Sequence, residues 1–298
     1  AKQALTVGQR IGVAPNATGA GNSNGSAYLL VKPSSGTVLD GFNDDYSNAD
    51  IILVNSKDKL DLAKSCKQYF NKKIVHRIDG VFGIYRNEPK LDELVHNFSN
   101  NIADGIICQS EWSMMIHKER GLKDHSKEVV IHNAANPKLF NTNYTKNQNK
   151  KIKIITTSWS PNWGKGFKTL QYLDENLNFD KYEYEFVGQS PTSFKNIKMT
   201  RALPQEELAE RVKECDIFFT ATENDTCSNS LLEALSCGLP TIGLKSGGTT
   251  ELISDGGGVY EHKNEILPLI DKISSNLKEF KSNIKIDNME TIGNKYYE

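Results

Sequence analysis

Two carboxylates, Asp225 and Glu233, stand near the start of an expected helix with seven residues between them. The apolar run 217–221 predicts a strand, a polar loop follows it, and the leucines within 228–237 are spaced as on one buried helix face. Asp225 would then precede the helix, and Glu233 would lie about one and a half turns inside it. Carboxylates accept hydrogen bonds from vicinal hydroxyls, so one acid suits a sugar and the other suits a ribose at the far end of one ligand.

The first turn of the same expected helix has the chemistry of an anion site. Ser228, Asn229 and Ser230 are small and polar, and a helix N-terminus offers unpaired N–H groups and a partial positive charge to a phosphate. Gly247 and Gly248 follow the next expected strand, where glycines let the backbone touch a sugar without a side-chain clash. The stretch 216–260 therefore indicates a site for a sugar joined to phosphate.

These residues carry a family resemblance. Asp225-Thr-Cys-Ser-Asn-Ser-Leu-Leu-Glu233-Ala-Leu-Ser-Cys-Gly-Leu-Pro240, followed by Gly247-Gly-Thr-Thr-Glu251, resembles the signature of family-4 retaining glycosyltransferases of the GT-B fold. The resemblance covers about residues 100–260 well and the first hundred poorly. It implies an α/β enzyme of two Rossmann-like, doubly wound parallel-sheet halves facing a cleft. Such an enzyme transfers a sugar from a nucleoside-diphosphate sugar with retention of configuration and needs no cofactor or metal.

The resemblance also implies donor-side roles. In the family a Lys–Gly pair precedes the first helix of the second half and contacts the donor diphosphate, and Lys165-Gly166 matches it. The family often has arginine where Ser160 stands, so a second positive charge on the diphosphate is either missing or supplied from elsewhere, with Arg201 as the candidate. The expected donor-binding residues are Ser158, Gly188, Arg201, Leu203, Thr226, Ser228, Asn229, Ser230, Gly247 and Gly248.

Candidate acceptor-side residues lie in the first half. The apolar run 73–78 predicts a strand, and Asp79 at its carboxyl end is expected to face the acceptor, with His76 and Arg77 beside it. Ser110 and Asn133 are expected to border the cleft. A glycine-rich loop is expected to face it too, through Gly19, Gly21 and Asn22. Asp79 joins Lys165, Asp225 and Glu233 as the expected catalytic set.

Four of these residues also have an interpretation that involves no ligand. Asp225 suits an Asx turn or a helix N-cap, and the family usually has Glu at its position. Glu233 could be a solvated helix acid, and Lys165 a surface lysine in a turn. His76 could equally be a core histidine with satisfied hydrogen bonds.

The elements that must position these residues alternate between strand and helix. Short runs that are apolar on both faces predict parallel strands covered on both sides, and their repetition predicts doubly wound α/β sheets. The expected strands are 10–14, 51–54, 73–78, 105–108, 129–132, 151–157, 184–187, 216–221, 240–244 and 258–260. Helices are expected at 205–215, 228–237 and 288–298, with a short helix at 26–30.

The polar, Asn-rich stretch 141–150 is typical of a linker. We expect an acceptor-side domain at 1–145, a donor-binding domain at 146–284, and a C-terminal helix at 285–298 that packs back on the first domain. The first domain is expected to be abbreviated, because residues 15–48 contain few apolar side chains.

Composition excludes several classes. The 298 residues carry a net charge of -1, so no overall basic field favours nucleic acid. The five cysteines form no CxxC pair, which fits a reducing compartment. No apolar run reaches bilayer-spanning length and no signal-peptide core begins the sequence. We expect a cytoplasmic protein without an aspartate–x–aspartate metal motif, whose acceptor is a glycan, a lipid-linked molecule or another compound. A weak peripheral membrane contact stays open.

Other functions remain to be weighed. A GT-B epimerase would release nucleotide and sugar without an acceptor, and a degenerate nucleotide or sugar binder would transfer nothing. Asp225, Ser160 and the thin first half favour the binder. A phosphorylase would need a pyridoxal-phosphate lysine and a far longer chain, and a Rossmann dehydrogenase would need to bind NAD.

Overall fold

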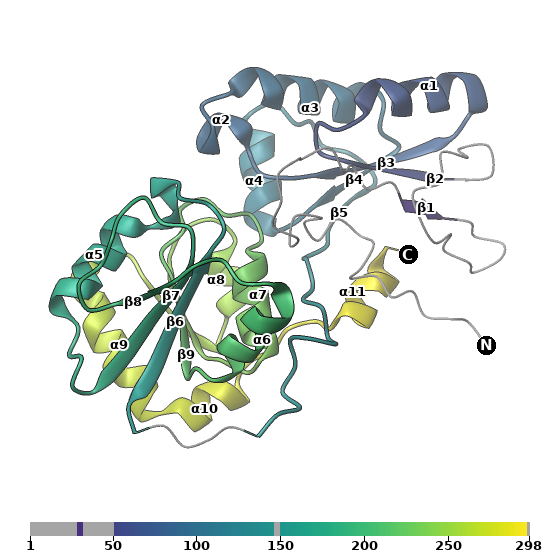
Figure 1. Cartoon of the computed structure of the whole chain (residues 1–298). Coiled ribbons are helices and arrows are strands. Elements are labelled where there is room, and N and C mark those ends of the chain that lie inside the picture. Colours follow the sequence, from purple (N-terminus) through teal and green to yellow (C-terminus); the bar gives the residue numbers. More distant parts are fainter. Residues whose placement is uncertain (1–28, 32–50, 146–149, 297–298) are drawn as a thin grey trace. The chain divides into compact units, whose positions relative to one another are not determined.

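The chain folds into two compact units (Figure 1). The computed structural model describes residues 29–31, 51–145 and 150–296. Within these ranges, unit 1 holds the residues up to Asn133 and the C-terminal segment from Met289, and unit 2 holds Ala134–Asn288. The chain therefore passes from unit 1 to unit 2 after Asn133 and returns after Asn288, and the expected linker residues 141–145 lie in unit 2.

Unit 2 is built on a six-stranded sheet in which every pairing is parallel. Its strands are β6 (Ile152–Ser158), β7 (Tyr182–Gly188), β8 (Lys198–Thr200), β9 (Ile217–Thr220), β10 (Thr241–Leu244) and β11 (Gly257–Tyr260). Their spatial order is β11-β10-β9-β6-β7-β8, so the winding direction reverses between β6 and β9. In doubly wound sheets, ligands bind beyond the carboxyl ends of the strands at such a reversal.

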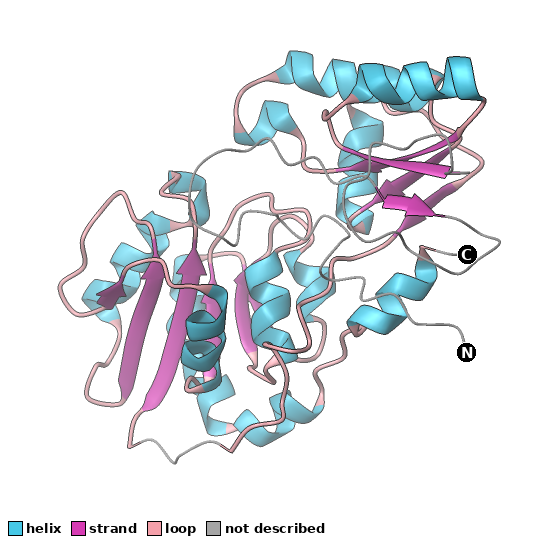
Figure 2. Cartoon of the chain, turned by 45° about the vertical axis from the view of Figure 1, so that its right-hand side comes forward, coloured by secondary structure: helices cyan, strands magenta, loops and turns pink. Residues whose placement is uncertain are grey.

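Helices cover both faces of this sheet, as Figure 2 shows for the cyan helices beside the magenta strands. They are η4 (Trp163–Lys165), α5 (Phe167–Asn176), α6 (Gln205–Lys213), α7 (Asn229–Ser236), α8 (Thr249–Ile253), η5 (Lys263–Glu265), α9 (Ile266–Ser275) and α10 (Leu277–Ser282). Neighbouring strand residues point to opposite faces. Ile155 accordingly packs in one apolar cluster with α6, α7 and α8, whereas Ile154 packs in another with α5 and α9.

Unit 1 contains a five-stranded sheet in the order β1-β2-β3-β4-β5. The strands are β1 (Leu29–Val31), β2 (Ile51–Asn55), β3 (Lys73–Ile78), β4 (Gly105–Cys108) and β5 (Glu128–Val130). β1 is antiparallel to β2, and the other pairings are parallel. The helices are α1 (Leu60–Phe70), α2 (Phe82–Tyr85), α3 (Pro89–Asn101), α4 (Glu111–Glu119) and α11 (Met289–Lys295).

One face of this sheet lies under α1, α2 and α3. The strand residues on it follow period 2, as Ile52 and Val54 do in β2, and they contact side chains of these three helices. His76 occupies the same face, because it pairs with Val54 and Ile106 in neighbouring strands and its ring lies edge-on to Phe98 of α3. The sequence of β3 thus directs His76 into the core and directs Arg77 to the opposite face.

The predicted α/β class and most of the predicted elements are confirmed. The strand predictions for 73–78 and 105–108 match the observed bounds, and α6, α7 and α11 begin at or one residue after their predicted starts. The sequence analysis did not find β1 or β8. The short helix predicted at 26–30 is wrong at Leu29 and Leu30, which lie in β1, and the strand predicted at 10–14 falls outside the described residues.

Within the described residues, no helix combines the length and apolar character needed to cross a membrane.

Candidate functional site

The loops that follow β6 and β9 meet at the reversal of the unit 2 sheet, and each contributes a charged group. Lys165 ends η4 in the first loop, and Asp225 lies in the second. The Lys165 ammonium Nζ lies 3.3 Å from the Asp225 carboxylate Oδ2. About a third of the lysine side chain and a fifth of the aspartate side chain are exposed, at 34% and 20%. A cation and an acid therefore stand side by side, open to a ligand.

Gly166 makes this meeting possible. Its φ of 87° is left-handed, and a Cβ placed on it would lie 2.3 Å from the Cβ of Ala221, just past β9. The Glu223 N–H also donates to the Gly164 carbonyl at 2.8 Å. Because only glycine allows both this conformation and this approach, the sequence Gly164-Lys165-Gly166 fixes the lysine against the end of β9.

The glycine pair after β10 holds Asp225 from the other side. The Gly248 N–H donates to the Asp225 carbonyl at 2.8 Å. Gly247 has φ 63°, and a Cβ there would lie 2.2 Å from the same carbonyl oxygen. Asn224 donates its N–H to Ser246 Oγ at 2.9 Å. Gly247 and Gly248, which were expected to face the sugar, thus fix the backbone of Asp225, the acid that was expected to bind it.

The N-terminus of α7 follows directly. Ser228 is its N-cap and accepts a hydrogen bond from the Leu231 N–H at 3.4 Å, and its hydroxyl also contacts the Ser230 hydroxyl at 3.1 Å. Thr226 and Ser228 are buried, whereas Asn229 and Ser230 are partly exposed. The predicted anion site is therefore a capped helix end whose first residues face outward.

Glu233 lies further along α7 and is coupled to a different loop. Burial raises the pKa of Glu233 to about 7, although a hydrogen bond with the Gln205 side chain acts to lower it. Gln205 begins α6 directly after the loop that contains Arg201 and Leu203. Leu203 packs against the apolar cluster under α6 and α7, and Arg201 is exposed. Glu233 and the loop that contains the expected donor-binding residues Arg201 and Leu203 are therefore neighbours.

Ser158 and Gly188 end the adjacent strands β6 and β7. The Gln189 N–H donates to the Ser158 carbonyl at 2.9 Å. Gly188 has φ 139°, and a Cβ on it would overlap that carbonyl oxygen at 1.8 Å. The Ser158 hydroxyl donates to the Ser160 carbonyl at 3.0 Å. Both residues thus shape the start of the Lys165 loop.

The sequence analysis assigned no role to two tryptophans in this loop. Trp159 and Trp163 leave 41% and 47% of their surface exposed, although Trp163 meets the buried Phe167 edge to face. The Asn162 side chain accepts the Gly164 N–H at 2.9 Å and so holds the turn that contains Trp163. The loop that carries Lys165 thus presents two partly exposed tryptophans.

In unit 1, the polar residues that follow the strands form a network around Arg77. Its Nη1 donates to Asn55 Oδ1 at 2.8 Å and lies 3.5 Å from Asp79 Oδ1, and its Nη2 donates to Asn133 Oδ1. Gln109 donates to the same Asp79 oxygen. Arg77 is thus a buried, organising cation, and Asp79 is the more exposed acid beside it. Asn55 and Gln109 were not predicted, although each is a polar residue at the end of an apolar strand.

His76 and Ser110 lie inside unit 1. His76 is fully buried, donates from Nε2 to the Ser56 carbonyl at 2.7 Å, and contacts Ser99 Oγ at 2.8 Å. Burial lowers the pKa of His76 to about 4, so the core alternative raised from the sequence fits its position. Ser110 is a buried N-cap of α4. Gly19, Gly21 and Asn22 fall outside the described residues.

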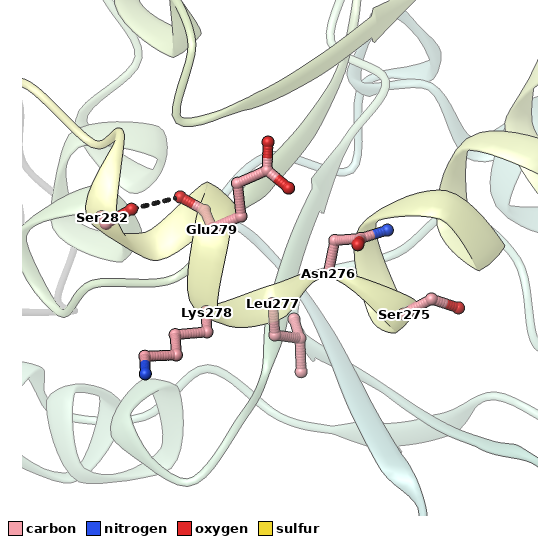
Figure 3. Close-up of a pocket in the computed structure, with 6 residues that line it drawn as sticks. All are labelled: Ser275, Asn276, Leu277, Lys278, Glu279 and Ser282. Atoms are coloured by element: carbon pink, nitrogen blue, oxygen red, sulfur yellow. Dashed lines mark hydrogen bonds between the residues drawn. The ribbon is translucent and has the colours of Figure 1, made fainter.

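A surface hollow of about 480 Å³ lies elsewhere in unit 2, where α9 meets α10 (Figure 3). It is lined by Ser275, Asn276, Leu277, Lys278, Glu279 and Ser282. None of the predicted site residues lines it. In the described part of the chain, no group of three or more His, Cys, Asp or Glu side chains is arranged to hold a metal ion.

Residues 193–289 match the family model of glycosyl transferases group 1. Among solved structures, HepE of Anabaena in complex with UDP-glucose is 15% identical, with a TM-score of 0.69 over 84% of this chain and 78% of that chain. Sucrose-phosphate synthase from Thermosynechococcus elongatus is also 15% identical, with a TM-score of 0.67 over 84% of this chain and 72% of that chain. The chain therefore has the GT-B fold, and the second half of unit 2 is similar to glycosyl transferases group 1.

One curated relative is an uncharacterized protein of Sulfolobus islandicus rod-shaped virus 1, which is 22% identical over 190 residues. These residues make up 57% of this chain and 53% of the relative. The chain thus spans about half the length of this relative.

Replacement of Gly166 should destabilise unit 2. In Gly166→Ala the new methyl group meets Ala221 in a left-handed conformation, and we expect a loss of roughly 2 kcal/mol and a fall in melting temperature of about 4–8 °C. Gly164→Ala is the matched control, because its added Cβ would meet nothing closer than 3.4 Å. Calorimetric melting of both variants measures the difference, and equal melting temperatures would contradict the packing argument.

The pKa of Glu233 predicts a pH dependence of stability. Native Glu233 keeps its proton up to about pH 7, whereas the unfolded carboxyl loses it near its ordinary value of 4.5. The unfolding free energy should therefore decrease as pH rises from about 4.5 to 7, by up to about 3 kcal/mol. Glu233→Gln should abolish that decrease and Glu207→Gln, at an exposed position of α6, should preserve it. Urea unfolding at pH 5 and pH 8 provides the comparison, and matching profiles for the wild type and Glu233→Gln would refute the assignment.

Proposed function

We propose that the chain transfers a sugar from a nucleoside-diphosphate sugar to a hydroxyl-bearing acceptor, with retention of anomeric configuration and without a metal ion, as in family 4. The observation that carries the proposal is the Lys165–Asp225 pair at the reversal of the unit 2 sheet. This is where an α/β sheet of this order binds ligands. The GT-B fold and the group 1 domain support the same activity.

The donor would occupy three neighbouring parts of unit 2. Lys165 and the exposed start of α7 would neutralise the diphosphate, and Asp225 with the Gly247-Gly248 backbone would hold the sugar. Glu233 would accept hydrogen bonds from the ribose hydroxyls beside the loop of Arg201 and Leu203. The short Lys165–Asp225 distance suits this arrangement, because a sugar and its diphosphate are adjacent in the donor.

The chemistry would rest on electrostatic stabilisation of the leaving group. The bond between the sugar carbon and the diphosphate oxygen breaks, and negative charge develops on that oxygen. A preorganised ammonium and helix N–H groups lower the energy of this charge. Donor binding would replace the direct Lys165–Asp225 contact, so that the ammonium turns to phosphate and the carboxylate to sugar hydroxyls.

One observation favours a binder without transfer activity as the second candidate. Ser160 stands where a second cation is expected, and its Oγ accepts the Asn162 N–H at 3.2 Å within the loop. A binder would hold the nucleotide sugar intact, whereas a transferase consumes it. Release of nucleoside diphosphate from the sugar nucleotide therefore separates the two.

A reducing, cytoplasmic environment belongs to the same proposal. All five cysteines are buried and none forms a disulfide, and burial raises the pKa of the Cys108 and Cys237 thiols to about 12. They act as buried packing residues, a role that requires no disulfide and therefore no oxidising compartment.

The phosphate contact is tested by calorimetry with UDP and uridine. UDP is the first choice because HepE was solved with a UDP-sugar, and ADP and GDP follow. Lys165→Ala should weaken UDP binding by about 1–2 kcal/mol, since the lysine is partly exposed and solvent screens its charge. Uridine binding should not change. Lys168→Ala, at an exposed position of α5, is the control and should match the wild type. If Lys165→Ala weakens both ligands equally, Lys165 does not bind phosphate.

Asp225 should separate nucleotide binding from sugar transfer. Asp225→Asn removes the competing partner of Lys165, so the affinity for UDP should stay unchanged or rise a few-fold. Turnover of UDP-glucose should fall by roughly 10-fold or more, because the lost contact is to the reacting sugar. Asp180→Asn, at an exposed position, controls for loss of a surface charge. If Asp225→Asn retains full turnover, Asp225 only shapes its turn and does not contribute to sugar transfer.

A further inference from the structure

Trp159 directly follows β6, one of the two strands between which the unit 2 sheet reverses its winding. The residue is 41% exposed, and within the described ranges no ring contact, hydrogen bond or ion pair holds its indole. Tryptophan normally buries a large apolar area. In sheets of this order ligands bind beyond the strand ends at the reversal, so this open indole stands where a ligand is expected.

The pairing of β6 with β7 indicates on which face of the sheet Trp159 lies. Thr157 pairs with Val187, which packs in the apolar cluster with α6 and α7. The pairing continues past the end of β6, because the Gln189 N–H donates to the Ser158 carbonyl at 2.9 Å. Strand residues two positions apart share a face, so Trp159 follows Thr157 onto the side of α6 and α7.

The residues proposed to hold the nucleotide lie on the same side. Ser228 caps α7, and Glu233 of α7 is hydrogen-bonded with Gln205 at the start of α6. A nucleotide with its diphosphate at the start of α7 and its ribose at Glu233 has its base attached to that ribose. The base would therefore lie at the strand ends on the α6 and α7 side, where Trp159 is exposed.

Among the described residues of unit 2, two other large apolar side chains are exposed, and their contacts lie on the opposite side of the sheet. Met199 pairs with Phe186, and Trp163 meets Phe167 edge to face. Phe186 and Phe167 belong to the apolar cluster with α5 and α9. Trp163 thus matches Trp159 in residue type, loop and exposure, at 47% against 41%, but its contact is with the α5 side.

An indole and a planar nucleobase are complementary surfaces, because each presents a broad π-face that can stack on the other. We propose that Trp159 stacks on the base of the bound nucleotide. The inference rests on the proposed function, since it adds a base contact to the same donor site. Stacking tolerates different bases, so Trp159 contributes affinity for the nucleoside, and the choice among bases is left to polar groups.

The test measures the binding of uridine and UDP by calorimetry in Trp159→Ala and Trp163→Ala, with melting curves to show that each variant is folded. We expect Trp159→Ala to raise the Kd of both ligands about 10-fold, as is typical for the loss of a base–aromatic stack. Trp163→Ala is the matched control and should leave both Kd values unchanged. Trp159→Phe keeps an aromatic face and should recover most of the affinity. Where the wild type prefers ADP or GDP, that nucleotide and its nucleoside replace UDP and uridine.

Tryptophan fluorescence gives a second readout. The chain contains three tryptophans, Trp112, Trp159 and Trp163, and a base that stacks on an indole quenches its emission. Saturating uridine should therefore quench the emission of the wild type and of Trp163→Phe. The emission of Trp159→Phe should stay unchanged, although this variant still binds uridine.

Several results would overturn the inference and leave the proposed function standing. Wild-type affinity of Trp159→Ala for uridine and UDP would show that no base stacks on the indole. A loss of affinity for UDP-glucose alone would assign Trp159 to the sugar. Equal losses in Trp159→Ala and Trp163→Ala would assign the effect to the loop as a whole. By contrast, a folded wild-type protein that binds no nucleoside diphosphate contradicts the proposed function and the inference together.

Discussion

The contact between Gly166 and Ala221 is the constraint on which the candidate site of unit 2 depends. At this point the loop after β6 touches the end of β9 with no room for a side chain. The approach places Lys165 within 3.3 Å of Asp225, and the Gly247-Gly248 turn closes on Asp225 from the next loop. Backbone proximity thus sets the position of both charges. A sheet that reversed its winding elsewhere would separate them, because the two loops would then leave non-adjacent strands.

In unit 1 a buried charge, rather than close backbone contacts, positions the polar residues. Its Arg77 is buried, and burial of a cation is costly unless polar partners surround it. The partners come from the ends of three strands and from the C-terminal segment, so the requirement for pairing draws these segments together. The Asp79 side chain is 44% exposed. The same interactions that satisfy the arginine also orient the carboxylate.

The two units therefore differ in how far apart in the sequence their candidate site residues lie. In unit 2 the predicted residues from Asp225 to Glu233 lie within one strand–loop–helix segment, from β9 to α7, and their spacing alone places them near one another. In unit 1 the network joins residues up to 219 positions apart. A pattern search along the sequence detects the first kind of site and misses the second, which explains why Gln109, Asn55 and Tyr296 were not predicted. Polar residues directly after apolar strands were the available signal for the first two.

The sequence by itself determined the α/β class, most strands and the helices that carry the donor motif. Buried parallel strands are continuous apolar runs and are recognised without context. β8 was missed because Lys198–Thr200 is a short, partly exposed edge strand with no such run. Only the tertiary structure decided that Lys165 meets Asp225, that Glu233 adjoins Gln205, and that Arg77 gathers polar residues from the ends of separate strands. These contacts depend on the order of the strands in each sheet, which the apolar pattern within a single strand does not encode.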